Sequence, residues 1–187
     1  MGGIFCWLLL NTRRWIPRTL QDFRAGRPVL FGAACGLLVA VVGVTTHGHT
    51  FGSGYAEARG MLESHTNVRI LYPVFKMMSM IGSYLPGAPG GLFAPSLAIG
   101  AEIGNTLHIL FSGLQLQMLI ALGMVGYLAA VTQSPITAFV IVIEMINGHA
   151  LVISLMATAL IASRVSRFFA PPLYEALSTR YHPQHDR

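Results

Sequence analysis

The residues best suited to chemistry lie in one stretch, residues 87–97, with the sequence GAPGGLFAPSL. Gly90 and Gly91 allow unusual φ and ψ angles, and Pro95 suits the first turn of a helix because it has no N–H to leave unpaired there. A helix that starts here would present backbone N–H groups near Leu92 and Phe93, and such groups bind anions. The same pattern also fits a short loop between two helices, and the spacing alone leaves both interpretations open.

No residues in the sequence have the spacing of a catalytic site. The chain has no paired carboxylates, no glycine-rich phosphate loop followed by a lysine, and no Cys/His set with zinc spacing. Glu102 and Glu144 lie in apolar segments, where they would either relay protons or pair within a helical bundle. The pair His47 and His49 is more typical of a polar loop than of a metal site. We therefore expect a protein that is not an enzyme and that needs no metal and no cofactor.

The composition predicts an integral membrane protein. Of the 187 residues, 53% are hydrophobic and only 10% are charged, whereas soluble domains usually carry about 25% charged residues. The net charge of +5 comes almost entirely from arginine, because Lys76 is the only lysine. Arginines that flank apolar segments indicate membrane topology, so the expected partner is the lipid bilayer and not nucleic acid. Cys6 and Cys35 each lie in an apolar stretch, which predicts buried, reduced thiols.

Apolar segments bounded by glycine and proline predict the helices that must position the glycine-rich stretch. Residues 28–46 form an apolar run long enough to cross about 30 Å of hydrocarbon. We expect further helices over residues 67–85, 95–110, 116–131, 136–146 and 150–163, a short amphipathic helix within residues 50–67, and another at residues 173–177. Lys76 lies inside one of these segments, where a structural lysine or one that extends its side chain to the membrane interface is favoured over a role in a substrate pathway. The arginine-rich loop at residues 13–27 and the tail after residue 174 should share the cytoplasmic side.

Several of these segments are shorter than the roughly 20 residues that cross a membrane straight. Half-length helices that meet near the middle of the bilayer are typical of transporters and channels built from repeats. The sequence therefore predicts an all-α membrane fold with tilted and broken helices, in which a helix end is available to an ion.

Three motifs, in chain order, resemble the CLC family of chloride channels and chloride–proton exchangers. The string GLFAP at residues 91–95 is similar to the family's Gly-x-Phe-x-Pro motif, and TQSPITA at residues 132–138 resembles the next pair of family helices. Pro172-Leu173-Tyr174 resembles the segment that carries the family's anion-binding tyrosine.

This resemblance implies a binding site for a partly dehydrated chloride ion, which would be the transported substrate. The backbone N–H groups of Leu92 and Phe93 and the hydroxyl of Tyr174 would donate hydrogen bonds to the ion. Gly90, Gly91 and Pro95 would form the supporting loop.

The resemblance covers only the second half of the family's inverted repeat. Neither Gly-Ser-Gly-Ile-Pro nor Gly-x-Glu-Gly-Pro occurs in the sequence, and in the family these motifs carry a serine ligand and the gating glutamate. Residues 1–187 are therefore expected to be a partial CLC-type membrane domain, multi-pass in a bacterial inner membrane, and a homodimer once the missing half completes it. The glutamates that would separate a channel from an exchanger are absent.

The alternative is a truncated remnant that does not transport, or a piece that serves in assembly or dimerisation. The small residues of the helix expected at residues 150–163 could pack such an interface.

Overall fold

The structure is a computed structural model that describes residues 1–11, 20, 26–48, 50–63, 71–86, 91–146, 151–173 and 176. Every regular element in these ranges is a helix, which confirms the predicted all-α fold for them. In chain order the helices are α1 (Gly2–Leu10), α4 (Pro28–Thr45), α5 (Tyr55–Glu63), α6 (Tyr72–Tyr84), α7 (Phe93–Leu110), α8 (Leu116–Thr132), α9 (Pro135–Ile146) and α10 (Val152–Arg167).

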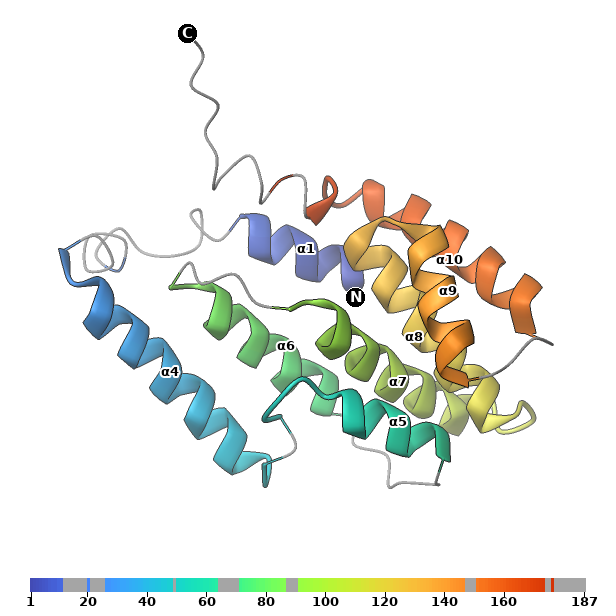
Figure 1. Cartoon of the computed structure of the whole chain (residues 1–187), viewed down its shortest axis with the longest axis horizontal. Coiled ribbons are helices and arrows are strands. Elements are labelled where there is room, and N and C mark those ends of the chain that lie inside the picture. The colour runs from blue at the N-terminus through green and yellow to red at the C-terminus, as the bar shows by residue number, and fades with distance from the viewer. Residues whose placement is uncertain are drawn as a thin grey trace, which may run out of the picture.

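Helices α7 and α8 form the centre of the fold (Figure 1), and glycine allows their backbones to touch. Gly100 and Gly104 of α7 face Gly123 of α8, and a Cβ atom added at Gly100 would lie 2.5 Å from the carbonyl oxygen of Gly123. No side chain fits between the helices at this crossing, so backbone packs directly on backbone, as in membrane helix pairs with small residues at their contact. The crossing fixes where α7 lies, and therefore where it starts.

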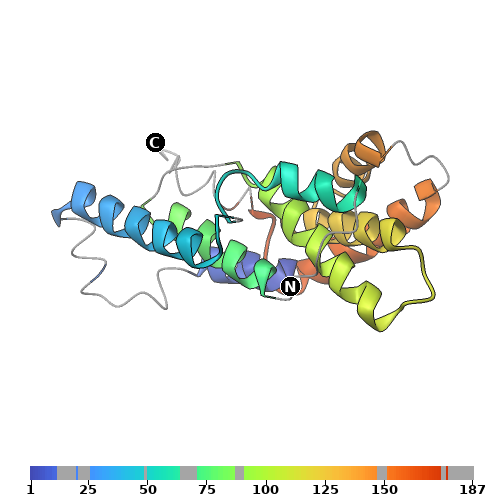
Figure 2. The same cartoon turned by 90° about the horizontal axis from the view of Figure 1, so that it is seen from below.

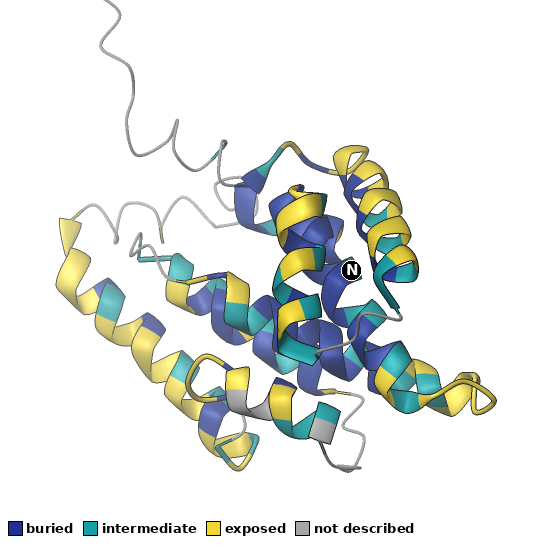
Figure 3. Cartoon of the chain, turned by 45° about the vertical axis from the view of Figure 1, so that its right-hand side comes forward, coloured by how far each residue is buried: buried dark blue, intermediate teal, exposed yellow. Residues whose placement is uncertain are grey.

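Apolar side chains cover the α7–α8 pair on both sides. One cluster joins the pair to α5, α9 and α10 through residues such as Leu97, Leu128 and Leu155, all of them buried. The other joins it to α1 and α6 through residues such as Phe5 and Met80. Figure 3 shows this buried centre in dark blue.

Helix α4 lies at the periphery beside α6 and exposes most of its surface (Figures 2 and 3). Its large apolar residues are left uncovered, with Val29 83% and Val44 70% exposed. Its mean hydropathy is 2.2 and only 17% of it is buried. Among the helices described, α4 alone is long and apolar enough to cross a membrane, while α8 and α9 are apolar but shorter.

Most predicted helices are present, with changes at their ends. Helix α7 starts at Phe93 and not at Pro95 as predicted, because Leu92 already has a helical backbone conformation (φ −94°, ψ −21°). Helix α10 continues to Arg167, beyond the predicted end at residue 163, and this extension places Arg164 in its last turn. Cationic side chains stabilise that end of a helix.

Helix α9 starts one residue before the predicted residue 136. Pro135 is the first helical residue, and the carbonyl oxygen of Ser134 accepts a hydrogen bond from the N–H of Ala138, 3.1 Å away. The short amphipathic helix predicted within residues 50–67 is α5. Most of the segment predicted at residues 173–177, and most of the arginine-rich loop, lie outside the described residues.

Both cysteines are buried and carry free thiols, as predicted. The Sγ of Cys6 contacts the carbonyl oxygen of Val131 at 3.5 Å, so this thiol helps to attach α1 to the end of α8.

Candidate functional site

The first turn of α7 is the centre of the candidate site. The helical hydrogen bonds begin with the N–H of Ser96, which donates to the carbonyl oxygen of Leu92 at 3.1 Å. In any α-helix the N–H groups that precede this first bond point outward along the axis, and they give the end a partial positive charge. Here that turn comprises Leu92, Phe93, Ala94 and Pro95, of which Pro95 has no N–H.

A cavity of about 520 Å³ lies at this helix start. Three segments form its walls: the start of α7, one face of α6, and the loop between α4 and α5, which Figure 1 shows reaching past the end of α4 toward α6 and α7. The lining residues are Thr50, Gly52, Ser53, Lys76, Ser79, Met80, Ser83, Tyr84, Gly91, Phe93, Ala94 and Pro95.

The chemistry of this lining favours an anion. It combines hydroxyl groups with one cationic side chain, that of Lys76, and no carboxylate is among the described residues that form the wall. A cavity lined by charge of one sign and bounded by protein raises the local concentration of ions of the opposite sign. The positive end of the α7 helix dipole adds to the same field.

Lys76 is a buried lysine with defined partners. Its side chain is 2% exposed. Its Nζ donates to the carbonyl oxygens of Thr50 and Gly52, both at 2.9 Å. The ammonium is thus directed at loop carbonyls inside the fold, which agrees with the structural role expected for this lysine.

The structure places the predicted anion-binding residues in different positions. Gly91, Phe93 and Pro95 line the cavity. The Leu92 side chain is 1% exposed and packs in the apolar cluster of α1 and α6, so only its backbone is available for an ion. Gly90 and Tyr174 lie outside the described residues.

The sequence analysis missed the contribution of α6. Lys76, Ser79 and Ser83 follow one another at positions i, i+3 and i+7, so they share one face of that helix and all line the cavity. This spacing of polar residues in an apolar segment was the available signal. The contribution of Thr50 and Gly52 had no comparable signal, because they lie more than 20 residues before Lys76.

The two acids considered for proton relay do not line this cavity. Glu102 is 1% exposed, in the middle of α7. Glu144 is exposed on α9, near the end of that helix.

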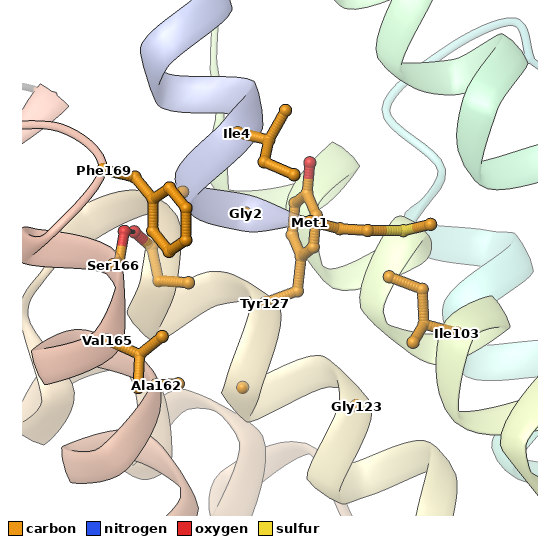
Figure 4. A pocket seen from close by; sticks show the side chains of 13 residues that line it. Met1, Gly2, Ile4, Ile103, Gly123, Tyr127, Ala162, Val165, Ser166 and Phe169 are labelled. Carbon is orange, nitrogen blue, oxygen red and sulfur yellow. Dashed lines mark hydrogen bonds between the residues drawn. The ribbon is translucent and has the colours of Figure 1, made fainter.

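A second cavity, of about 330 Å³, has a different character (Figure 4). It lies where α1 begins, beside α8 and α10, and Figure 4 shows Tyr127 between Ile103 on one side and Phe169 on the other. The hydroxyl of Ser166, which also lines it, donates to the carbonyl oxygen of Ala130. Its lining includes no charged side chain among the described residues, so it is much less suited to an inorganic anion than the cavity at α7.

Helices interrupted at glycine-rich stretches, with a helix start directed at a positively charged cavity, are typical of helical ion-transport proteins. The profile of the family described as voltage gated chloride channel matches residues 1–167, and the chain belongs to that family.

Similar proteins carry a transporter name. The chain is 29% identical over 160 residues to the H(+)/Cl(-) exchange transporter ClcA of Yersinia pestis bv. Antiqua (strain Angola), a match that covers 81% of this chain and 32% of the relative. It is 28% identical over 192 residues to the ClcA proteins of Citrobacter koseri and Salmonella arizonae, with 96% of this chain and 40% of each relative covered. The chain thus spans about a third to two fifths of the length of these relatives.

Proposed function

We propose that the chain is the anion-binding part of a CLC-type chloride transporter and that chloride binds in the cavity at the start of α7. The observation that supports this most directly is the composition of the cavity wall: a helix start, several hydroxyl groups and one buried ammonium, without a carboxylate among the described lining residues. Neutral donors at a helix start hold an anion less tightly than direct contact with a full positive charge, and transport requires that the ion can leave.

In this proposal the backbone N–H groups of Leu92 and Phe93 donate to the ion, and the hydroxyl of Tyr174 donates a further hydrogen bond. Gly90, Gly91 and Pro95 shape the loop so that the backbone can approach the ion closely. Of these six residues, Gly91, Phe93 and Pro95 line the cavity, which supports this part of the proposed site.

The proposal assigns to the chain the second half of an inverted repeat, which the rest of a CLC-type domain would complete. The chain matches 32% to 40% of the relatives' length, which agrees with a part of such a domain; the motifs at residues 91–95, 132–138 and 172–174 are the reason for assigning the second half. The completed protein would be a multi-pass homodimer in a bacterial inner membrane. The exchanger name of the relatives favours coupled chloride–proton exchange over channel conduction.

The decisive experiment measures chloride binding by calorimetry on the purified chain in lipid nanodiscs. Phe93→Pro removes one N–H at the first helical position, where proline is tolerated. Phe93→Ala removes the ring and keeps the N–H, so it is the matched control. We expect Phe93→Pro to weaken binding more than Phe93→Ala does. If the two variants bind chloride equally, with unchanged helix content, the ion does not contact this N–H.

The outer face of α10 favours a second candidate function, a role in assembly. Its small residues Ala159 and Ser163 are buried within the chain, whereas Ile153 and Ile161 are 80% and 64% exposed. The exposed face also carries the small residue Ala157, so an interface on this helix would combine large apolar residues with small ones. A chain that forms stable dimers but binds no chloride would support this alternative.

A further inference from the structure

We infer that Lys76 is the positioning residue of the anion cavity: its ammonium holds the loop wall in place and supplies the positive charge that makes the cavity select anions. The inference deepens the proposed function and depends on it, since it concerns the same cavity.

Lys76 contacts the loop wall of the cavity directly. Thr50, Gly52 and Ser53 are the loop residues that line the cavity. Two of them accept hydrogen bonds from the Lys76 Nζ, at 2.9 Å each. One side chain from α6 therefore holds two of the three loop residues that form this wall.

The loop is rich in residues that fold at an entropic cost. Gly48, Gly52 and Gly54 all have positive φ angles, between 69° and 86°. Glycine carries the largest backbone entropy in the unfolded chain. Contacts from outside the loop therefore help to fix its conformation, and the Lys76 ammonium provides two of them.

The loop also approaches α6 and α7 closely. A Cβ atom added at Gly54 would lie 2.7 Å from the Cβ of Ala98 and 3.4 Å from the Cε of Lys76. The loop is thus packed against the lysine side chain itself, and the lysine cannot leave without opening a gap beneath the loop.

Lys76 also sets the charge of the cavity wall. Lys76 is the only cation among the described residues that line the cavity, and it is shielded from solvent. The two loop carbonyls accept hydrogen bonds from the ammonium and so use two of its three N–H donors. The ammonium therefore acts on an anion in the cavity mainly through its electric field and not as a tight contact ligand. This arrangement attracts anions but still allows release.

The test compares Lys76→Met, Lys76→Arg and wild type as the full 187-residue chain in nanodiscs. Val74→Ala, on α6 but outside the cavity wall, is the control for general effects on that helix. Chloride affinity is measured by calorimetry, and hydrogen exchange of residues 46–54 is followed by mass spectrometry. Hydrogen exchange measures directly how well the loop's backbone amides are protected, and this measurement does not depend on chloride.

We expect Lys76→Met to bind chloride roughly tenfold more weakly, because the nearby charge is lost, and to exchange faster in residues 46–54. The chloride affinity of Lys76→Arg should stay within about threefold of that of wild type, since a guanidinium keeps the charge and can donate to two carbonyls. Val74→Ala should resemble wild type in both measurements. If Lys76→Met fails to fold, Lys76→Gln replaces it, because the amide keeps N–H donors but not the charge.

Two results would overturn the inference, and they are distinguishable. If wild type binds chloride and Lys76→Met binds it equally well with unchanged loop exchange, the inference fails while the proposed function stands. If wild type itself binds no chloride and Phe93→Pro changes nothing, the proposed function fails and this inference fails with it.

Discussion

Single residues determine how tightly the proposed site would hold an ion. Phe93 illustrates this, because it lines the cavity and is also the first residue of α7. Its ring is 40% exposed, so substitution of the ring alone should disturb packing very little. Backbone and side-chain contributions can therefore be separated at this position by the choice of substitution.

The Tyr174 hydroxyl can be tested in the same way. In the completed transporter, Tyr174→Phe should weaken chloride binding by about 1 kcal/mol, the value of one hydrogen bond, because the ring is kept and only the donor is lost. Calorimetry with the wild-type protein as reference checks this. Unchanged affinity would mean that the hydroxyl does not reach the ion.

Gly54 provides a residue-scale test of the loop wall. Gly54→Ala should lower chloride affinity several-fold without unfolding the chain, because φ is +78° and the added methyl group would collide with Ala98 of α7. Gly52→Ala is the comparison, since it shares the positive φ but has no neighbouring atom within 4 Å of the added Cβ. Equal affinity losses in the two variants would attribute the effect to backbone strain and not to displacement of the loop from α7.

At the scale of helices, the crossing of α7 and α8 packs backbone directly on backbone and leaves no room for a side chain. Gly123→Ala should lower the free energy of unfolding by about 1–3 kcal/mol, because a methyl group must enter a backbone-to-backbone contact. Gly36→Ala, on the open side of α4 with nothing within 4 Å, should be neutral or slightly stabilising. Thermal unfolding in the same detergent compares the two variants, and equal melting temperatures would contradict the packing argument.

The sequence predicted the helices better than it predicted their contacts. Segments such as residues 28–46 are recognisable because length and apolar composition are local properties, and α4 agrees with that prediction to within one residue at its end. The start of α7 was placed two residues late, because proline is found at several positions in a first turn and its presence alone does not identify the first residue.

The candidate site was only partly predictable for a similar reason. The glycine-rich start of α7 is a continuous motif, so it could be found without a structure. The wall opposite it depends on Lys76 meeting carbonyl groups 24 and 26 residues earlier in the chain. Backbone carbonyls carry no residue-type signal, so nothing in the sequence identified these two as the partners of the lysine.

At the scale of the whole molecule, the exposed apolar surface of α4 agrees with a position in a bilayer. The proposed topology places residues 13–27 in the cytoplasm and the other end of α4 outside. In intact cells, a membrane-impermeant maleimide should therefore label His47→Cys and leave Leu20→Cys unlabelled. Native Cys6 and Cys35 are buried and should react slowly, so they provide a low background. The reverse labelling pattern would overturn this orientation.

The proposed division of the domain predicts that this chain alone forms no complete pore. Purified and reconstituted in liposomes, it should give no selective chloride flux comparable to that of an intact member of the family. A chloride-sensitive electrode measures the efflux, with an intact relative as the positive control. Efflux at the rate of the intact relative would show that no second half is needed.

The contact between Gly100, Gly104 and Gly123 also limits how this protein can move. Where two helices touch through their main chains, neither can slide or roll without a clash, so α7 and α8 must travel as one rigid unit. An ion held at the start of α7 would then keep its main-chain donors through any working cycle. Opening and closing of the ion's route would then fall to the parts around that unit, α6 and the loop between α4 and α5 that Lys76 holds.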